Sequence, residues 1–155
     1  MAYYLQANYG RALLQDKKIQ DLIVQLDKGV EATWGEMASV GVVRECTYCA
    51  LNGGGSCCGA GMEKMYDEIL LLINLLLGKT FPEQANDPSS CYFLSEQGCT
   101  LRAREVICVN YLCQRLYKNI EREKLIHLQR ITGEELKTLF ILEECIKKEI
   151  NIQRR

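Results

Sequence analysis

Residues 62–78 read MEKMYDEILLLINLLLG, and they carry the clearest structural signal in the chain. Their large apolar side chains recur three or four positions apart, which is the spacing of one face of an α-helix. These residues are Met62, Tyr66, Ile69, Leu70, Ile73, Leu76 and Leu77. Glycine is common just after the end of a helix, so the pattern predicts a buried helix that begins at Met62 and ends at Gly78.

The chain before residue 44 predicts two more helices. Ile19, Leu22, Ile23 and Leu26 share one helical face, and Gly29 predicts the end of that helix. Residues 31–40 predict a second, short helix. Between it and Met62, residues 45–61 read ECTYCALNGGGSCCGAG, with four cysteines and five glycines. Such a stretch is too flexible for regular structure and predicts a ligand-binding loop.

The chain after Gly78 begins with a connection and continues as helix. Residues 79–90 contain both prolines and several turn formers, which predicts a surface connection. From about residue 102 to 130 helix formers predominate, so one long helix is expected, with Cys108 and Cys113 near its start. Thr132 and Glu135 have the spacing of a capping box and predict the start of a final helix.

These elements predict an all-α fold, a helical bundle with irregular cysteine-rich metal-binding loops. The 155 residues fit a single domain 1–155, made of an N-terminal helical segment 1–43, a cysteine-cluster metal-binding region 44–115 and C-terminal helices 116–155. Apolar residues make up 48% and charged residues 25%, which is ordinary globular usage.

Charge and hydropathy argue against several classes of partner. The formal net charge of −1 gives no overall field that would attract nucleic acid. The longest apolar run, residues 69–78, is about half of what a membrane-spanning helix needs. The N-terminus lacks the features of a secretory signal, so a cytoplasmic protein is expected.

Nine cysteines are the outstanding feature of the composition. In a reducing compartment clustered thiols indicate metal or redox chemistry rather than disulfides. Eight cysteines form two groups along the chain, Cys46, Cys49, Cys57 and Cys58, followed by Cys91, Cys99, Cys108 and Cys113. We interpret these eight as metal-ligand candidates, with Cys57 the weakest, and Cys145 as a core residue.

The spacing of the candidates has a chemical reason. A Cys-x2-Cys pair lets two sulfurs converge on one ion, and a set of thiolates leaves excess negative charge that the protein must stabilise. Four arginines flank the cysteine groups and are candidates for that role, the alternative being a solvated surface: Arg44, Arg102, Arg104 and Arg115. The positive end of the helix expected from Met62 is another candidate.

Other motifs give weaker signals. Cys46 and Cys49 also match a thioredoxin-like dithiol, but the preceding strand that this motif requires is missing. The glycine run lacks the Gly-Lys-Ser/Thr ending of a phosphate loop. His127 lies far from the cysteines in a charged helical stretch, so we interpret it as an ordinary helix residue.

The cysteine pattern resembles that of the YkgJ-like cysteine-cluster family of zinc- or iron-chelating domains over residues 46–113. The matching positions are Cys46, Cys49 and Cys58, then Cys91 and Gly98-Cys99, then Arg104-x3-Cys108 followed by Tyr111. The chain departs from the family in its longer spacing before Cys57 and in Glu105, where proline is common. Cys113 resembles the extra cysteine of a richer branch. The resemblance implies metal chelation.

We therefore expect a metal-binding protein that holds one or two iron–sulfur clusters of the 4Fe–4S type. Sulfur-only ligands, their number and apolar shielding favour iron–sulfur over zinc. Electron transfer, cluster carriage or iron handling would follow, with a protein redox or metal-transfer partner. The alternatives are a zinc-stabilised helical adaptor that binds a protein partner, and a thiol- or cluster-dependent redox enzyme. An enzyme is less favoured than a binding protein, and the oligomeric state is left open.

Overall fold

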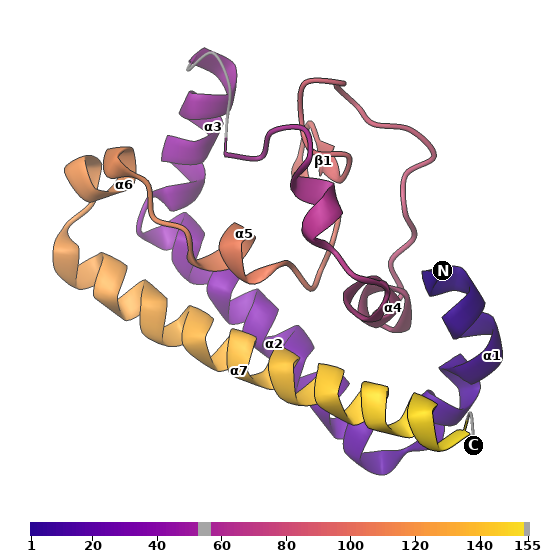
Figure 1. The fold of residues 1–155 in the computed structure, drawn as a ribbon. Helices are drawn as coiled ribbons and strands as arrows, with labels where there is room; N and C mark the ends of the chain where they lie inside the picture. Colours follow the sequence, from indigo (N-terminus) through magenta and orange to yellow (C-terminus); the bar gives the residue numbers. More distant parts are fainter. Residues whose placement is uncertain (53–56, 154–155) are drawn as a thin grey trace.

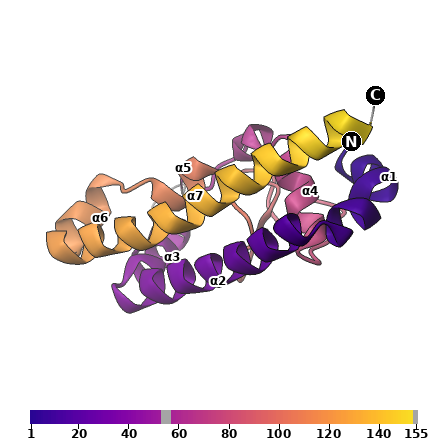
Figure 2. The same cartoon turned by 90° about the horizontal axis from the view of Figure 1, so that it is seen from below.

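Two long helices form the base on which the rest of the chain lies. The computed structural model describes residues 1–52 and 57–153. Helix α1 (Ala2–Gln15) leads into α2 (Lys17–Ser39), which lies beside α7 (Arg122–Gln153) and runs in the opposite direction (Figures 1 and 2). The remaining elements lie on one face of this pair (Figure 1).

Helix α2 continues through the glycine that was expected to end it. Asp16 caps its start by accepting a hydrogen bond from the Ile19 backbone N–H at 2.9 Å. The predicted end at Gly29 and the separate helix over residues 31–40 are wrong, because both lie within α2. A Cβ atom added at Gly29 would lie 3.4 Å from the Glu135 Cα, so the glycine serves close packing of α2 on α7.

Helix α7 is likewise one element where two were expected. The predicted start at Thr132 is wrong, since the helix runs unbroken from Arg122. The Thr132 hydroxyl donates to the Gln129 carbonyl at 3.1 Å, so it is satisfied within the helix instead of capping it. Glu135 is buried, with 1% of its surface exposed, and faces α2 rather than a helix end.

Residues 62–78 begin with a short 3₁₀ helix, η1 (Met62–Met65), and the α-helix α4 (Glu68–Leu76) follows it. The side chain of Asp67 sets this later start by accepting from the backbone N–H groups of Ile69 and Leu70. The expectation that an α-helix starts at Met62 and points its positive end at the cysteines is therefore wrong. Gly78, with φ of +76°, follows the helix end as predicted.

Two cysteine-bearing stretches also differ from expectation. Residues before the glycine run form α3 (Val42–Asn52) rather than a loop, and residues 53–56 lie outside the described part. The helix expected over 102–130 is divided into α5 (Val106–Asn110), α6 (Gln114–Asn119) and the start of α7. Strands β1 (Leu94–Ser95) and β2 (Gly98–Cys99) form a small antiparallel hairpin, and the fold is otherwise mostly helical.

The apolar interior has two parts. The main core is built from α1, α2, α4 and the C-terminal half of α7 and includes Leu13, Leu26, Leu72, Ile73, Leu142 and Ile146. The second core lies near the other end of α7 and consists of Met37, Val42, Val109, Leu116, Ile120, Leu125 and Leu128. Among the described residues, no helix combines the length and apolar character needed to cross a membrane.

Candidate metal centre

Electrostatic interactions among the eight clustered cysteines divide them into two groups whose membership differs from their order in the sequence. We name Cys58, Cys91, Cys99 and Cys108 the inner group, and Cys46, Cys49, Cys57 and Cys113 the outer group. The fold has exchanged one cysteine from each sequence group, because Cys58 lies with the later cysteines and Cys113 with the earlier ones.

Mutual electrostatic effects define these groups. Burial raises the pKa of Cys58 most, and the nearby charges of Cys108 and Cys91 raise it further. Burial is also the main reason that the Cys99 pKa rises to about 11, with Cys108 and Cys91 again adding to the effect. In the outer group the Cys46 pKa is raised to about 11 by burial and then by Cys58, Cys113, Cys57 and Cys49. The effect of Cys58 on Cys46 shows that the groups adjoin.

Backbone pairing brings Cys58 into the inner group. The Cys91 N–H donates to the Cys58 carbonyl at 2.8 Å, and the Ala60 N–H donates to the Ser89 carbonyl at 3.1 Å. Gly59 and Ser90 form an isolated antiparallel bridge between these bonds. The segment after the glycine run is thus joined to the segment before the hairpin, which places Cys58 beside Cys91.

The hairpin and α5 supply the other inner cysteines. Cys99 lies on β2 opposite Leu94, and the Thr100 N–H extends the pairing to the Phe93 carbonyl at 2.9 Å. Cys108 lies in the first turn of α5, where the Tyr66 hydroxyl donates to its Sγ at 3.6 Å. Cys91, Cys99 and Cys108 all contact the main core.

The segment that carries Arg104 is fixed by Asn74, a fully buried residue of α4. The Asn74 Oδ1 accepts from the Arg102 and Ala103 N–H groups at 2.7 and 3.0 Å, and its Nδ2 donates to the Ala103 carbonyl at 2.8 Å. Arg102 in turn donates from Nε to Asp27 of α2 at 2.6 Å. This anchoring places Arg104 inside the protein.

Arg104 is a buried cation next to the inner group. Only 4% of its surface is exposed, and its guanidinium carbon lies 4.2 Å from the centre of the Trp34 ring. Its charge opposes the burial that raises the pKa of Cys58, Cys99 and Cys108. Among the described residues, its Nε and Nη2 atoms have no hydrogen-bond acceptor.

An ion pair between α3 and α6 brings cysteines of the outer group close to one another. Glu45, 7% exposed, accepts from Asn119 Nδ2 at 2.7 Å and pairs with Arg115 Nε at 2.9 Å. The Asn119 hydrogen bond is the largest cause that lowers the Glu45 pKa. Because Glu45 adjoins Cys46 and Arg115 follows Cys113 by two positions, this link brings the two cysteines together.

Three outer cysteines lie on α3 or at the start of α6, and Cys57 lies in a bend beside Cys58. Cys46 and Cys49 are one turn apart on α3, so their side chains share a face of that helix. Cys113 is the N-cap residue of α6 and contacts the second core. The Arg115 guanidinium lies 4.2 Å from the centre of the Tyr48 ring. Cys46 and Cys57 are exposed, whereas Cys91 of the inner group is buried.

The thiols are not drawn together around one point. Among the described residues, no three side chains of cysteine, histidine, aspartate or glutamate are arranged to hold a metal ion. The raised pKa values of Cys46 and Cys99, each about 11, mean that these thiols are protonated at neutral pH, as expected of apolar surroundings. Metal binding would have to displace these protons and move the sulfurs closer together.

The remaining sequence predictions have mixed outcomes. Cys145 packs against the main core as expected, and His127 is an exposed residue of α7. The surface interpretation fits Arg44, which is largely exposed, but is wrong for Arg104. Sequence reasoning missed Asn74 and Glu45. A polar residue on an otherwise apolar helix face was the available signal for Asn74.

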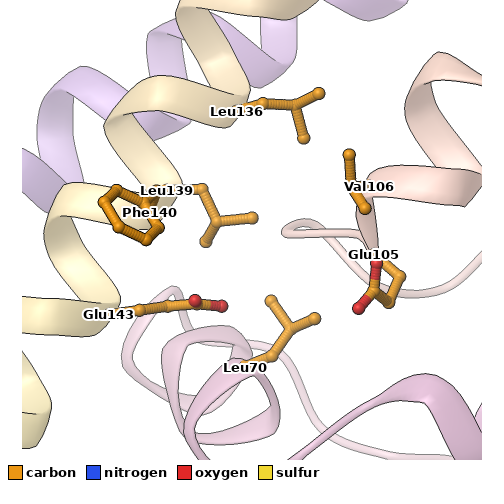
Figure 3. Close-up of a pocket in the computed structure, with 7 residues that line it drawn as sticks. All are labelled: Leu70, Glu105, Val106, Leu136, Leu139, Phe140 and Glu143. Atoms are coloured by element: carbon orange, nitrogen blue, oxygen red, sulfur yellow. The ribbon is translucent and has the colours of Figure 1, made fainter.

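A cavity of about 260 Å³ opens next to the helix that carries Cys108. It is lined by Leu70, Glu105, Val106, Leu136, Leu139, Phe140 and Glu143, from α4, α7 and the start of α5 (Figure 3). Burial is the largest cause that raises the Glu143 pKa, and the nearby charges of Asp67 and Glu105 raise it further. None of the cysteines lines this cavity.

Comparison with known proteins assigns no family to this chain. No protein-family model, curated protein or solved structure matches it. The resemblance to the YkgJ-like family therefore stays a prediction, and function has to be argued from the residues of the site.

Proposed function

We propose that this chain binds metal through cysteine thiolates, and that the inner group holds an iron–sulfur cluster for electron transfer, cluster carriage or iron handling with a protein partner. The supporting observation is Arg104, a buried guanidinium with two unsatisfied nitrogens beside the inner thiols. A buried cation without an acceptor is costly for a protein. A cluster held by four thiolates is anionic and would offset that cost.

The donor set fits this assignment. Cys58, Cys91, Cys99 and Cys108 supply four sulfurs, which is the number that a 4Fe–4S cluster takes from a protein. The Tyr66 hydroxyl already donates to the Cys108 sulfur, and hydrogen bonds of this kind tune the potential of bound clusters. Phe93 and Leu101, which are close in sequence to the inner cysteines Cys91 and Cys99, are buried in the main core. A bound cluster would supply one-electron redox chemistry.

Zinc is the second candidate for the inner group, and one observation favours it. The inner cysteines join three segments with little regular structure, the turn after Cys57, the hairpin and α5. Four thiolates also complete a tetrahedral zinc site, and structural zinc stabilises folds of this kind. The protein would then be an adaptor, with metal replacing part of a core.

Iron, sulfide and zinc content, measured with an absorption spectrum on protein purified without oxygen, tests the proposal. Matched iron and sulfide with a broad visible band is the expected result. Zinc alone would make the adaptor the better proposal. Protein that binds neither metal after anaerobic reconstitution would overturn both.

A pair of variants locates the centre. Cys99→Ala combined with Cys108→Ala should remove the inner metal, because two of four ligands are lost. Cys145→Ala is the matched control, since Cys145 packs against the same core but belongs to neither group. Equal metal content in the two variants would place the centre elsewhere.

A further inference from the structure

We infer that the outer group is a second, separate four-thiolate metal site, adjacent to the inner one and more open to solvent. This inference rests on the proposed function and extends it from one centre to two. Four cysteines complete either a zinc site or the protein ligands of a 4Fe–4S cluster, so each group is a full ligand set by itself.

The two groups of cysteines are held in place by different structural elements. Cys46, Cys49 and Cys113 are held by α3 and the start of α6, which the ion pair of Glu45 with Arg115 joins, and Cys113 contacts the second core. Cys57 lies outside these helices, beside Cys58. The inner cysteines are held by the hairpin, α5 and the pairing of Cys58 with Cys91, and they contact the main core. Each support fixes its own set of sulfurs, which favours two centres over one large cluster.

The adjacent residues Cys57 and Cys58 belong to different groups. The charges of Cys113 and Cys49 act on Cys57, whereas those of Cys108 and Cys91 act most on Cys58, which also interacts with Cys57 and Cys46. The sequence alone does not show whether two neighbouring cysteines bind the same metal centre. In the structure one peptide bond links the two sites and keeps them close to each other.

The sites differ in charge and in access. The inner site has the buried cation Arg104, whose Nε and Nη2 atoms have no acceptor among the described residues. The nearest arginine of the outer site, Arg115, already pairs with Glu45 and contacts the Tyr48 ring. Two outer cysteines, Cys46 and Cys57, are exposed, whereas the inner group has one exposed cysteine, Cys58, and one buried cysteine, Cys91. Metal in the outer site should therefore be less stabilised and should exchange first with a chelator or a partner.

The test compares two variants of the full chain, Cys57→Ser and Cys58→Ser. These residues are neighbours and both are exposed, so neither change should prevent folding. Wild-type protein is loaded with Zn²⁺ alone or reconstituted with iron and sulfide, and metal per chain is measured before and after a chelator pulse. Iodoacetamide labelling with mass spectrometry then identifies which cysteines the metal protects.

Two centres predict a specific result. Wild-type protein should hold two centres and lose one of them first, with Cys46 and Cys113 becoming labelled before Cys91 and Cys99. Cys57→Ser should bind one centre fewer before the pulse and expose the outer cysteines, and Cys58→Ser should expose the inner cysteines instead. A double variant Cys46→Ala/Cys113→Ala should retain one centre.

The failing outcomes separate the two levels of the proposal. If wild-type protein saturates at one centre, or if either serine variant exposes all seven remaining clustered cysteines, the two-site inference is wrong while metal binding stands. If wild-type protein binds no metal and all eight cysteines label freely, the proposed function fails as well.

Discussion

The inner and outer groups each contain four cysteines, and their surroundings differ in packing and in charge. The inner group lies against the main core beside a buried arginine, and the outer group lies where two helices are joined by a carboxylate, with Cys46 and Cys57 exposed. Identical ligands thus acquire different charge balance and different access. The surroundings, more than the identity of the ligands, therefore determine how the two sets of cysteines differ.

The largest effect on stability is expected from a substitution in the main core, against which the inner group packs. Leu142→Ala empties a fully buried position of the main core and should lower the free energy of unfolding by about 2–5 kcal/mol. Chemical denaturation followed by circular dichroism measures it. Ile141→Ala is the control, since the adjacent Ile141 is 37% exposed and its change should cost far less. Similar costs for both would show that this core is not closely packed.

The second largest effect is expected from removing the buried positive charge next to the inner group. Arg104→Gln removes the buried cation and should weaken metal binding at the inner group by about 10–100-fold, the range typical of residues that support metal ligands. Competition with a chromophoric chelator measures the affinity. Arg44→Gln serves as the matched control, because Arg44 is largely exposed beside the outer group. An inner affinity unchanged in Arg104→Gln would remove the main support for the proposed function.

Thiol labelling of metal-free protein compares how readily a reagent reaches and modifies the cysteines of the two groups. Cys57 is exposed, whereas burial raises the Cys99 pKa to about 11 and covers part of the residue. Only the thiolate reacts, so iodoacetamide at pH 7.5 should label Cys57 before Cys99. Raising the pH should speed Cys99 labelling, by about tenfold per pH unit below its pKa. Faster labelling of Cys99 than of Cys57 would contradict the assignment of inner and outer.

The smallest effect concerns Glu135, which is buried in the base beneath the inner group. Burial raises its pKa, and the Thr33 hydroxyl and the charges of Arg104 and Arg102 oppose that rise only in part. The folded state therefore binds a proton more tightly than the unfolded state, and stability from this group is lost as the pH rises above the ordinary glutamate range. Glu135→Gln should flatten the slope of the unfolding free energy against pH above the ordinary glutamate range. An unchanged slope would show that Glu135 does not titrate there.

The helical class could be predicted from the sequence, which also supplied the candidate cysteines but not their grouping. Helical spacing found the faces of α2 and α4, because burial of one stripe is a local pattern. Local stop and start signals failed at Gly29 and Thr132, where packing of α2 on α7 overrides them. Such packing joins residues far apart in the chain, so no local pattern encodes it.

The exchange of Cys58 and Cys113 between groups has the same cause. It depends on the pairing of Cys58 with Cys91 and on the link between Glu45 and Asn119, which no spacing rule contains. Arg104 was one of four flanking arginines in the sequence. Its burial depends on the anchoring of its segment by Asn74, which lies 28 and 29 residues away in the sequence from the groups that it binds.

The hydrogen bonds of Asn74 imply an order of folding. They connect positions 28 and 29 residues apart, whereas the bond between Glu45 and Asn119 spans 74 residues. Closing the longer loop costs more chain entropy, by about 1 kcal/mol for this ratio of lengths. We expect α4 to dock against the segment before α5 first, so that the chain forms one cysteine group while the ends of the other are still apart.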